Sequence, residues 1–132
     1  MTVALTASRS PVIGIDPASY RDPAGFVFHR DGRVYRAIRQ AAAADYARLS
    51  DSGLVERLVK RGWLVPTAEV DAAICPMDDV VAVVEHEALP LVTYPYEWGF
   101  EALKAAALLH LDVHLAALDA GFTLSDGNAY NV

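Results

Sequence analysis

The chain has 132 residues, and 17 acidic residues against 11 lysines and arginines give it a formal net charge of −6. This balance argues against a nucleic-acid-binding protein, because such a protein needs a clustered positive surface to displace counterions from phosphates. Hydrophobic residues make up 54% of the sequence and charged residues 21%, which excludes an intrinsically disordered chain and predicts one globular domain with a buried core.

Cysteine content and hydropathy indicate the cellular compartment and the chemistry open to this chain. Cys75 is the single cysteine, so no intrachain disulfide and no cysteine-based metal cluster can form. Without a basic neighbour, Cys75 is expected to be a small apolar core residue and not a nucleophile. We predict no secretion signal and no run of the roughly 20 apolar residues that a membrane span needs. The expected location is the cytoplasm, with neither membrane nor nucleic acid as a partner.

The first predicted element after the amino terminus is a β-hairpin. Residues 1–22 show no sustained hydrophobic period and are expected to be a mostly irregular leader. The apolar runs 26–28 and 34–38 then flank Asp31 and Gly32. Because glycine tolerates a positive φ, an Asp-Gly pair favours the tight turn between two antiparallel strands.

Two helices and a second pair of strands are expected next. The alanine-rich stretch 41–49 and the amphipathic stretch 54–61 are typical of helices, and Gly62 ends the second of them. The runs 80–84 and 89–94 are short and rich in β-branched residues. We therefore expect these two runs to form a second antiparallel pair.

The strongest helix signal covers residues 98–120 and ends at Gly121. Large apolar residues recur along it at spacings of three and four, which predicts one buried stripe. The stripe consists of Phe100, Leu103, Ala107, Leu111, Leu115 and Leu118. Residues 129–132 look like the opening of a further strand that has no evident partner, so we expect the folded unit to be incomplete at its carboxyl end.

The segment after the long helix places Asp126 and Asn131 five positions apart. This is the spacing of the catalytic loop of kinases, where the aspartate accepts the proton of the attacking hydroxyl and the asparagine holds a magnesium ion. Spacing alone is a weak signal, but here a long apolar helix precedes it. We therefore name Asp126 as the candidate catalytic base and Asn131 as the candidate ligand of magnesium and nucleotide.

The order of the expected elements is also that of a kinase-like unit. Arg36 falls on the strand where kinases carry a phosphate-binding lysine, and Glu56 falls on the following helix. We name both as candidate cofactor-binding residues that pair with each other. The alternative is a solvated strand arginine and an exposed helix carboxylate. The glycine-rich phosphate loop of kinases is missing, and the predicted fold is an α+β, incomplete protein-kinase-like fold over residues 23–132.

Two further features have weaker functional interpretations. His110 and His114 lie four positions apart on the long helix and could share a metal ion, but helix histidines bonded to neighbouring polar groups are the favoured interpretation. Residues 94–98, Tyr-Pro-Tyr-Glu-Trp, could line a pocket between two lobes. A packed strand-to-helix corner is favoured over direct ligand contact there.

Four segments together resemble one bacterial family. They are residues 21–25, 31–37, 94–98 and 126–132, and they look like SAM-dependent methyltransferases related to a nodulation protein. The resemblance implies that this chain is the amino-terminal portion and that the methyltransferase domain follows later. It also implies a further strand after residue 132, with an aspartate that resembles a second magnesium ligand of kinases. Nothing in this chain resembles a SAM-binding glycine loop.

Three functions follow from these observations. The first is the front part of a SAM-dependent methyltransferase, inactive alone, with S-adenosylmethionine as cofactor of the full-length family and the methyltransferase region as partner. The second is a kinase-like phosphotransfer module that binds ATP and Mg²⁺, with Asp126 as base, Asn131 as metal ligand and Arg36 on the phosphates. The third is a non-catalytic interaction domain that positions the methyltransferase region.

Overall fold

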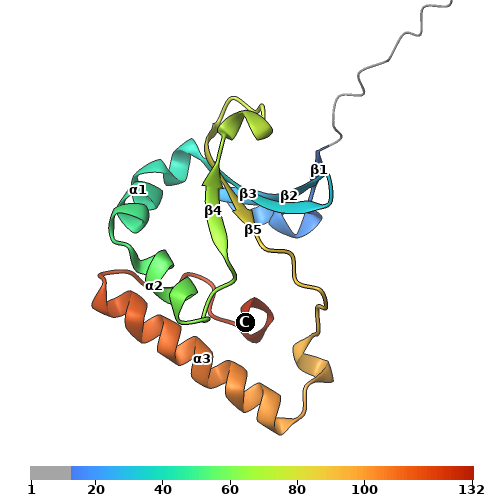
Figure 1. Ribbon diagram of the computed structural model, residues 1–132, viewed down its shortest axis with the longest axis vertical. Helices are drawn as coiled ribbons and strands as arrows, with labels where there is room; N and C mark the ends of the chain where they lie inside the picture. Colours follow the sequence, from blue (N-terminus) through green and yellow to red (C-terminus); the bar gives the residue numbers. More distant parts are fainter. Residues whose placement is uncertain (1–12) are drawn as a thin grey trace, which may run out of the picture. The chain divides into compact units, whose positions relative to one another are not determined.

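The computed structural model describes residues 13–132 and divides them into two compact units (Figure 1). The first unit extends to Ala43 and resumes over Ala68–His86, and the second consists of Ala44–Thr67 and Glu87–Val132. The two units thus alternate along the chain.

The first unit is built on an antiparallel sheet with the strand order β1-β2-β3-β5-β4. In chain order, the strands in the described part of the chain are β1 (Gly14–Ile15), β2 (Gly25–Arg30), β3 (Arg33–Arg39), β4 (Thr67–Val70) and β5 (Val80–His86). β3 lies in the middle of this order, so its residues contact strands on both sides.

The predicted hairpin is confirmed by β2 and β3. Their pairing runs from Gly25 opposite Ile38 to Arg30 opposite Arg33. Asp31 has a φ of 52° and the glycine after it a φ of 76°. Two positive φ values in a two-residue loop match the twist of the strands, as the Asp-Gly pair predicts.

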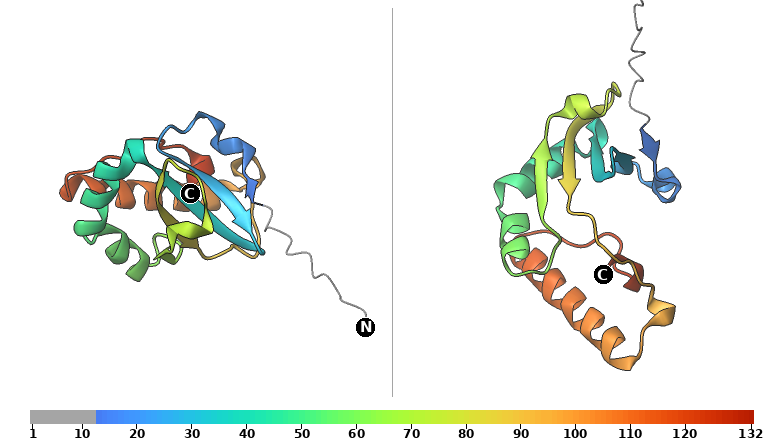
Figure 2. Two further views of the ribbon diagram at one scale, coloured as in Figure 1. Left: turned by 90° about the horizontal axis from the view of Figure 1, so that it is seen from above. Right: turned by 45° about the vertical axis from the view of Figure 1, so that its right-hand side comes forward.

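The strand predicted over 80–84 is confirmed as β5, but the strand predicted over 89–94 is wrong. Residues 89–94 are exposed and form no strand. Their Pro90 has no amide hydrogen for a ladder. β5 pairs instead with β3, with His86 opposite Val34, and β4 lies beside β5 at the edge (Figures 1 and 2).

Residues 13–22 are more ordered than the predicted leader. β1 pairs with β2, and a 3₁₀ helix covers Pro17–Arg21. Ser19 Oγ accepts a hydrogen bond of 2.9 Å from the backbone N–H of Val27. β1 therefore extends the sheet by pairing with the edge of β2 that β3 leaves unpaired. The rest of the predicted leader lies outside the described residues.

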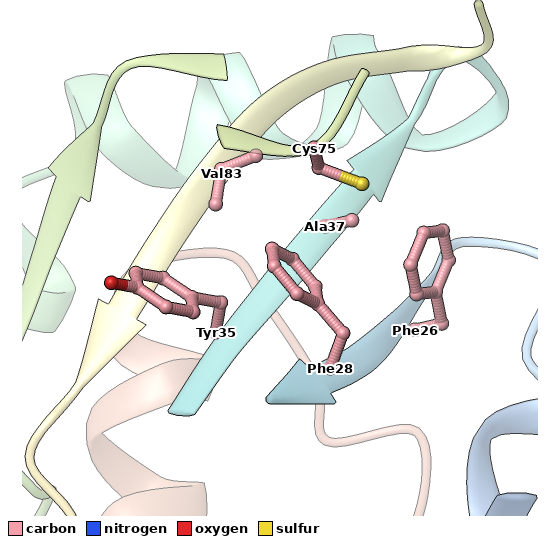
Figure 3. Close-up of a cluster of buried hydrophobic side chains, with 6 residues drawn as sticks. All are labelled: Phe26, Phe28, Tyr35, Ala37, Cys75 and Val83. Carbon is pink, nitrogen blue, oxygen red and sulfur yellow. The ribbon is translucent and has the colours of Figure 1, made fainter. Parts of the chain in front are cut away.

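One cluster of buried side chains forms the core of the first unit (Figure 3). Aromatic rings dominate it, and those of Phe28 and Tyr35 stack with their centroids 5.2 Å apart. Its members are Phe26, Phe28, Tyr35, Ala37, Cys75 and Val83. Cys75 is 2% exposed and serves as an apolar core residue, as expected from its sequence surroundings.

The second unit contains the three predicted helices with small shifts at their ends. They are α1 (Ala43–Asp51), α2 (Leu54–Lys60) and α3 (Phe100–Asp119). Gly62, with a φ of 72°, and Gly121, with a φ of 80°, follow the ends of α2 and α3, as expected for left-handed helix ends. Within residues 13–132, no helix combines the length and the apolar character needed to span a bilayer.

α3 buries a face different from the predicted stripe. Ala117 packs into a buried cluster with Leu54 and Leu58 of α2, surrounded by partly buried residues such as Val113. The predicted stripe is exposed along its whole length at Phe100, Leu103, Ala107, Leu111, Leu115 and Leu118. Because α3 is apolar on both sides, the hydrophobic period does not reveal which side is covered.

Candidate functional site

The candidate site lies in the segment that follows α3. Gly121 ends the helix, and the chain finishes in a 3₁₀ helix over Ala129–Asn131 instead of the predicted opening of a strand. The side chain of Asn128 caps this helix, because its Oδ1 accepts a 2.9 Å hydrogen bond from the N–H of Tyr130. The cap favours a helical turn and brings Asn131 back toward Asp126.

Asp126 and Asn131 are held together by hydrogen bonds within their loop. Asn131 Nδ2 donates to the backbone carbonyl of Asp126 at 2.8 Å. Asn128 Nδ2 donates to the Asp126 carboxylate at 2.7 Å. The side chain of Asn128 therefore serves both ends of the loop, and sequence reasoning missed it. The Asx-type spacing of Asn128 and Tyr130 is the signal that could have found it.

The loop packs closely against α3 at His110. A Cβ placed on Gly127 would lie 2.8 Å from His110 Nε2, so a larger residue would displace either the loop or the imidazole. Sequence reasoning considered His110 as a metal ligand or a helix histidine, whereas the structure places it beneath the candidate loop. The glycine leaves room for this close approach of the imidazole.

Beside the loop lies an open cavity of about 520 Å³ in the second unit. Most of its wall is apolar, and Asp126, Ser125 and Asn131 provide polar groups. The other lining residues are Trp63, Leu64, Val65, Leu89, Leu109, His110, Val113, Leu124, Tyr130 and Val132. An apolar pocket with a few converging polar groups is the usual form of a small-molecule site.

Arg36 lies on β3 in the first unit and forms an ion pair with Asp22. Glu56 lies exposed on the first turn of α2, in the second unit. The structure thus gives Arg36 a partner that the sequence did not suggest, because Asp22 was placed in an irregular leader. The pairing of Arg36 with Glu56, and a cleft shared by Arg36 and the Asp126 loop, stay predictions.

Arg36 also shapes the titration of its neighbours. Burial raises the pKa of Asp22, but hydrogen bonds from Ala24 and Arg36 and the charge of Arg36 lower it more, so the net pKa is below its ordinary value. Burial lowers the pKa of His86, and the positive charge of Arg36 lowers it further. The neutral form of His86 is therefore favoured beside a fixed cation.

The remaining candidates for a nucleophile or a metal ligand are Cys75, His110 and His114. Burial, followed by the charge of Asp79, raises the pKa of the Cys75 thiol, which disfavours the reactive thiolate. His110 and His114 are both partly buried on α3. Within residues 13–132, no three histidine, cysteine, aspartate or glutamate side chains come close enough to hold a metal ion together.

The aromatic segment before α3 forms a corner held by its own side chains. The rings of Tyr94 and Tyr96 stack with centroids 5.6 Å apart. Glu97 accepts a hydrogen bond of 2.8 Å from the N–H of Tyr94, and Trp98 Nε1 donates to Thr93 Oγ1 at 2.9 Å. The predicted packed strand-to-helix corner differs from this arrangement, because no strand directly precedes the segment in the described part of the chain and Tyr94 and Tyr96 are 45% and 75% exposed.

The chain is 42% identical over 125 residues to the nodulation protein NoeA of Rhizobium meliloti (strain 1021). The similarity extends over nearly the whole length of this chain. The match covers 93% of this chain but 26% of NoeA, so the chain spans about a quarter of that relative. The resemblance to nodulation-related proteins is thus confirmed by NoeA.

Comparison with family models and with solved structures adds no further relative. No family model matches the chain, and no solved structure matches it. The mixed α and β composition predicted from the sequence is confirmed. The finer comparison with kinases therefore depends on the order of the elements and on the loop from Asp126 to Asn131.

Proposed function

We propose that this chain is the amino-terminal, kinase-like portion of a NoeA-related SAM-dependent methyltransferase and that it transfers no methyl group alone. The observation that carries this proposal is the match to about a quarter of NoeA over 93% of the chain. The methyltransferase activity belongs to the proposal through the family resemblance of residues 21–25, 31–37, 94–98 and 126–132. We extend the proposal to a role in nodulation because NoeA is named as a nodulation protein.

A chimera tests this proposal directly. In the chimera, this chain replaces the matching 125 residues of NoeA. We expect calorimetric titration with S-adenosylmethionine to show binding to NoeA and to the chimera, and no binding to the isolated chain. Binding by the isolated chain would contradict its proposed inactivity. A NoeA that binds no S-adenosylmethionine would contradict the methyltransferase assignment itself.

A second candidate function is supported by the geometry of the Asp126 loop: binding of a magnesium nucleotide. The amide nitrogen of Asn131 donates to the Asp126 carbonyl, and its Oδ1 is the atom that would bind a cation. One carboxylate oxygen of Asp126 accepts from Asn128, which leaves the other for a cation or a proton. Magnesium commonly takes one or two protein oxygens and completes its shell with phosphates and water.

These residues would have separate roles in such a site. Asn131 would hold the metal ion, which neutralises charge on the transferring phosphoryl group. Asp126 would orient and accept the proton of the attacking hydroxyl. Arg36 is a weaker phosphate ligand in this proposal, because Asp22 already neutralises it. The second candidate therefore depends on Asp126 and Asn131.

Magnesium-dependent nucleotide binding distinguishes the second candidate from the first. We expect ATP with Mg²⁺ to raise the melting temperature of the chain, because a ligand that binds only the folded state stabilises it. Asp126→Asn is expected to reduce this shift while the loop stays folded, since the backbone carbonyl that accepts from Asn131 remains. Asp112→Asn on the exposed face of α3 is the matched control for the loss of one charge. The absence of any magnesium-dependent shift would contradict this candidate and leave the first intact.

A further inference from the structure

One face of α3 carries large exposed apolar side chains along the helix, and the exposed Lys104 lies among them. Its large side chains are between 51% and 75% exposed at Phe100, Leu108, Leu111, Leu115 and Leu118. A helix of 20 residues is about 30 Å long, so these side chains form an apolar ridge that is densest from Leu108 to Leu118 and contains one charged residue, Lys104. Contiguous apolar surface of this kind is uncommon on an isolated protein and marks an interaction site.

The ridge takes no part in the buried cluster of the second unit. The opposite face of α3 supplies Ala117 and Val113 to the cluster that includes Leu54 and Leu58 of α2. That cluster accounts for the anchoring of α3. A helix that is apolar on both faces belongs to the interior of a larger assembly, and the ridge is the face still to be covered.

A row of carboxylates borders the ridge on one side. Glu101, Asp112 and Asp119 are all exposed. At 100° per residue, the three positions lie within about 20° of one another around the helix axis and next to the column of Leu108 and Leu115. A surface that covers the ridge therefore meets a line of negative charge along one edge. Complementarity requires lysines or arginines there.

We propose that the α3 ridge, defined as Phe100, Leu108, Leu111, Leu115 and Leu118, docks onto the part of the NoeA-related protein outside the 125-residue match. The docking surface is apolar and carries basic residues along the edge that faces Glu101, Asp112 and Asp119. This inference rests on the proposed function, since it takes the remaining three-quarters of a NoeA-like chain as the occupant.

The charges favour this occupant over a second copy of the chain. A second copy brings the same acidic row and its own net charge of −6, and like charges at an interface oppose association. A region of the same polypeptide has a high effective concentration at the ridge and needs no separate binding step. The ridge is thus an intramolecular interface of the longer protein.

Hydroxyl-radical footprinting of the isolated chain and of the NoeA chimera tests this proposal. We expect Leu108, Leu111 and Leu115 to be oxidised severalfold more slowly in the chimera than in the isolated chain. Equal oxidation in both proteins overturns the proposal. Protection that already exists in the isolated chain and grows with its concentration also overturns it, because the occupant is then a second copy.

A pair of variants separates contact from folding. Leu111→Asp with Leu115→Asp in the chimera is expected to return the oxidation of Phe100 and Leu108 to the rate of the isolated chain. Leu91→Asp is the control, because Leu91 is also a highly exposed leucine, at 75%, but lies outside α3. If the double variant does not fold, the wild-type footprint decides. Titration of the same chimera with S-adenosylmethionine reports separately on the proposed function, so either proposal can fail without the other.

Discussion

Arg36 is the residue whose environment differs most from its sequence interpretation. The strand position suggested a cation directed at phosphates, but the guanidinium is paired with Asp22. Asp22 also accepts a 2.8 Å hydrogen bond from the backbone N–H of Ala24. The pair therefore joins the segment before β2 to the middle strand of the sheet. We expect its loss to lower the free energy of unfolding.

Asp22→Asn is expected to lower the free energy of unfolding by about 1 kcal/mol at neutral pH. The two side chains are 36% and 31% exposed, so solvent screening keeps the value near that of surface pairs, about 1 kcal/mol or less. Because the folded pKa of Asp22 lies below its ordinary 3.8, the contribution is full above that value and disappears as pH falls through the folded pKa. Urea denaturation at neutral and strongly acidic pH measures it. A difference between variant and wild type that persists at strongly acidic pH would contradict the ionic origin.

His86 provides a second test of the charge on Arg36. Its pKa is lowered first by burial and then by Arg36, so an NMR titration should give a midpoint below 6.5. Arg36→Gln removes the cation and is expected to raise this midpoint while burial keeps it below 6.5. The lowered pKa makes the folded state lose stability as pH falls below 6.5, because the unfolded chain binds the proton more readily. A midpoint unaffected by Arg36→Gln would show that burial alone sets it.

At the scale of the strand, the hairpin depends on a close approach at Gly25. A Cβ at this position would lie 2.2 Å from the carbonyl oxygen of Ala37 on β3. Gly25→Ala is therefore expected to cost about 1–3 kcal/mol of stability, the usual range for forced overpacking. Gly14→Ala is the matched control, since its nearest atom, the carbonyl oxygen of His29, is 3.9 Å away. Equal melting temperatures for the two variants would show that β2 and β3 separate at low cost.

Elements defined by local signals were predictable, and those defined by distant pairing were not. The Asp-Gly turn and the glycines after α2 and α3 set their elements through backbone conformation alone. β4 was missed because it is a four-residue edge strand whose partner, β5, lies beyond an intervening 3₁₀ helix. Residues 89–94 have the composition of a strand, but they pair with none of the strands in the described part of the chain. Whether β4 and residues 89–94 form strands therefore depends on pairing with strands distant in the sequence.

The sequence pointed to the two end residues of the candidate loop and not to its internal contacts. The five-residue spacing identified Asp126 and Asn131, and the structure joins them by a hydrogen bond. The roles of Asn128 and of His110 under Gly127 depend on how the loop folds back on α3. A spacing rule contains no such information. The hydrophobic period likewise located α3 but predicted the wrong face to be buried, because it contains no information on where the helix packs.

At the scale of the whole molecule, each unit has a buried cluster of its own, which predicts separate responses to core mutations. Leu58 is 4% exposed within the second cluster, and Phe28 is fully buried within the first. Leu58→Ala is expected to cost about 2–5 kcal/mol and to speed hydrogen exchange in α2 and α3 while the amides of β2 and β3 keep their protection. Phe28→Ala is expected to give the reverse pattern, because local opening follows contiguous packed units. Exchange that rises equally in both units in either variant would mean that the two clusters unfold together, and the helices of the second unit would then depend on the sheet for their stability.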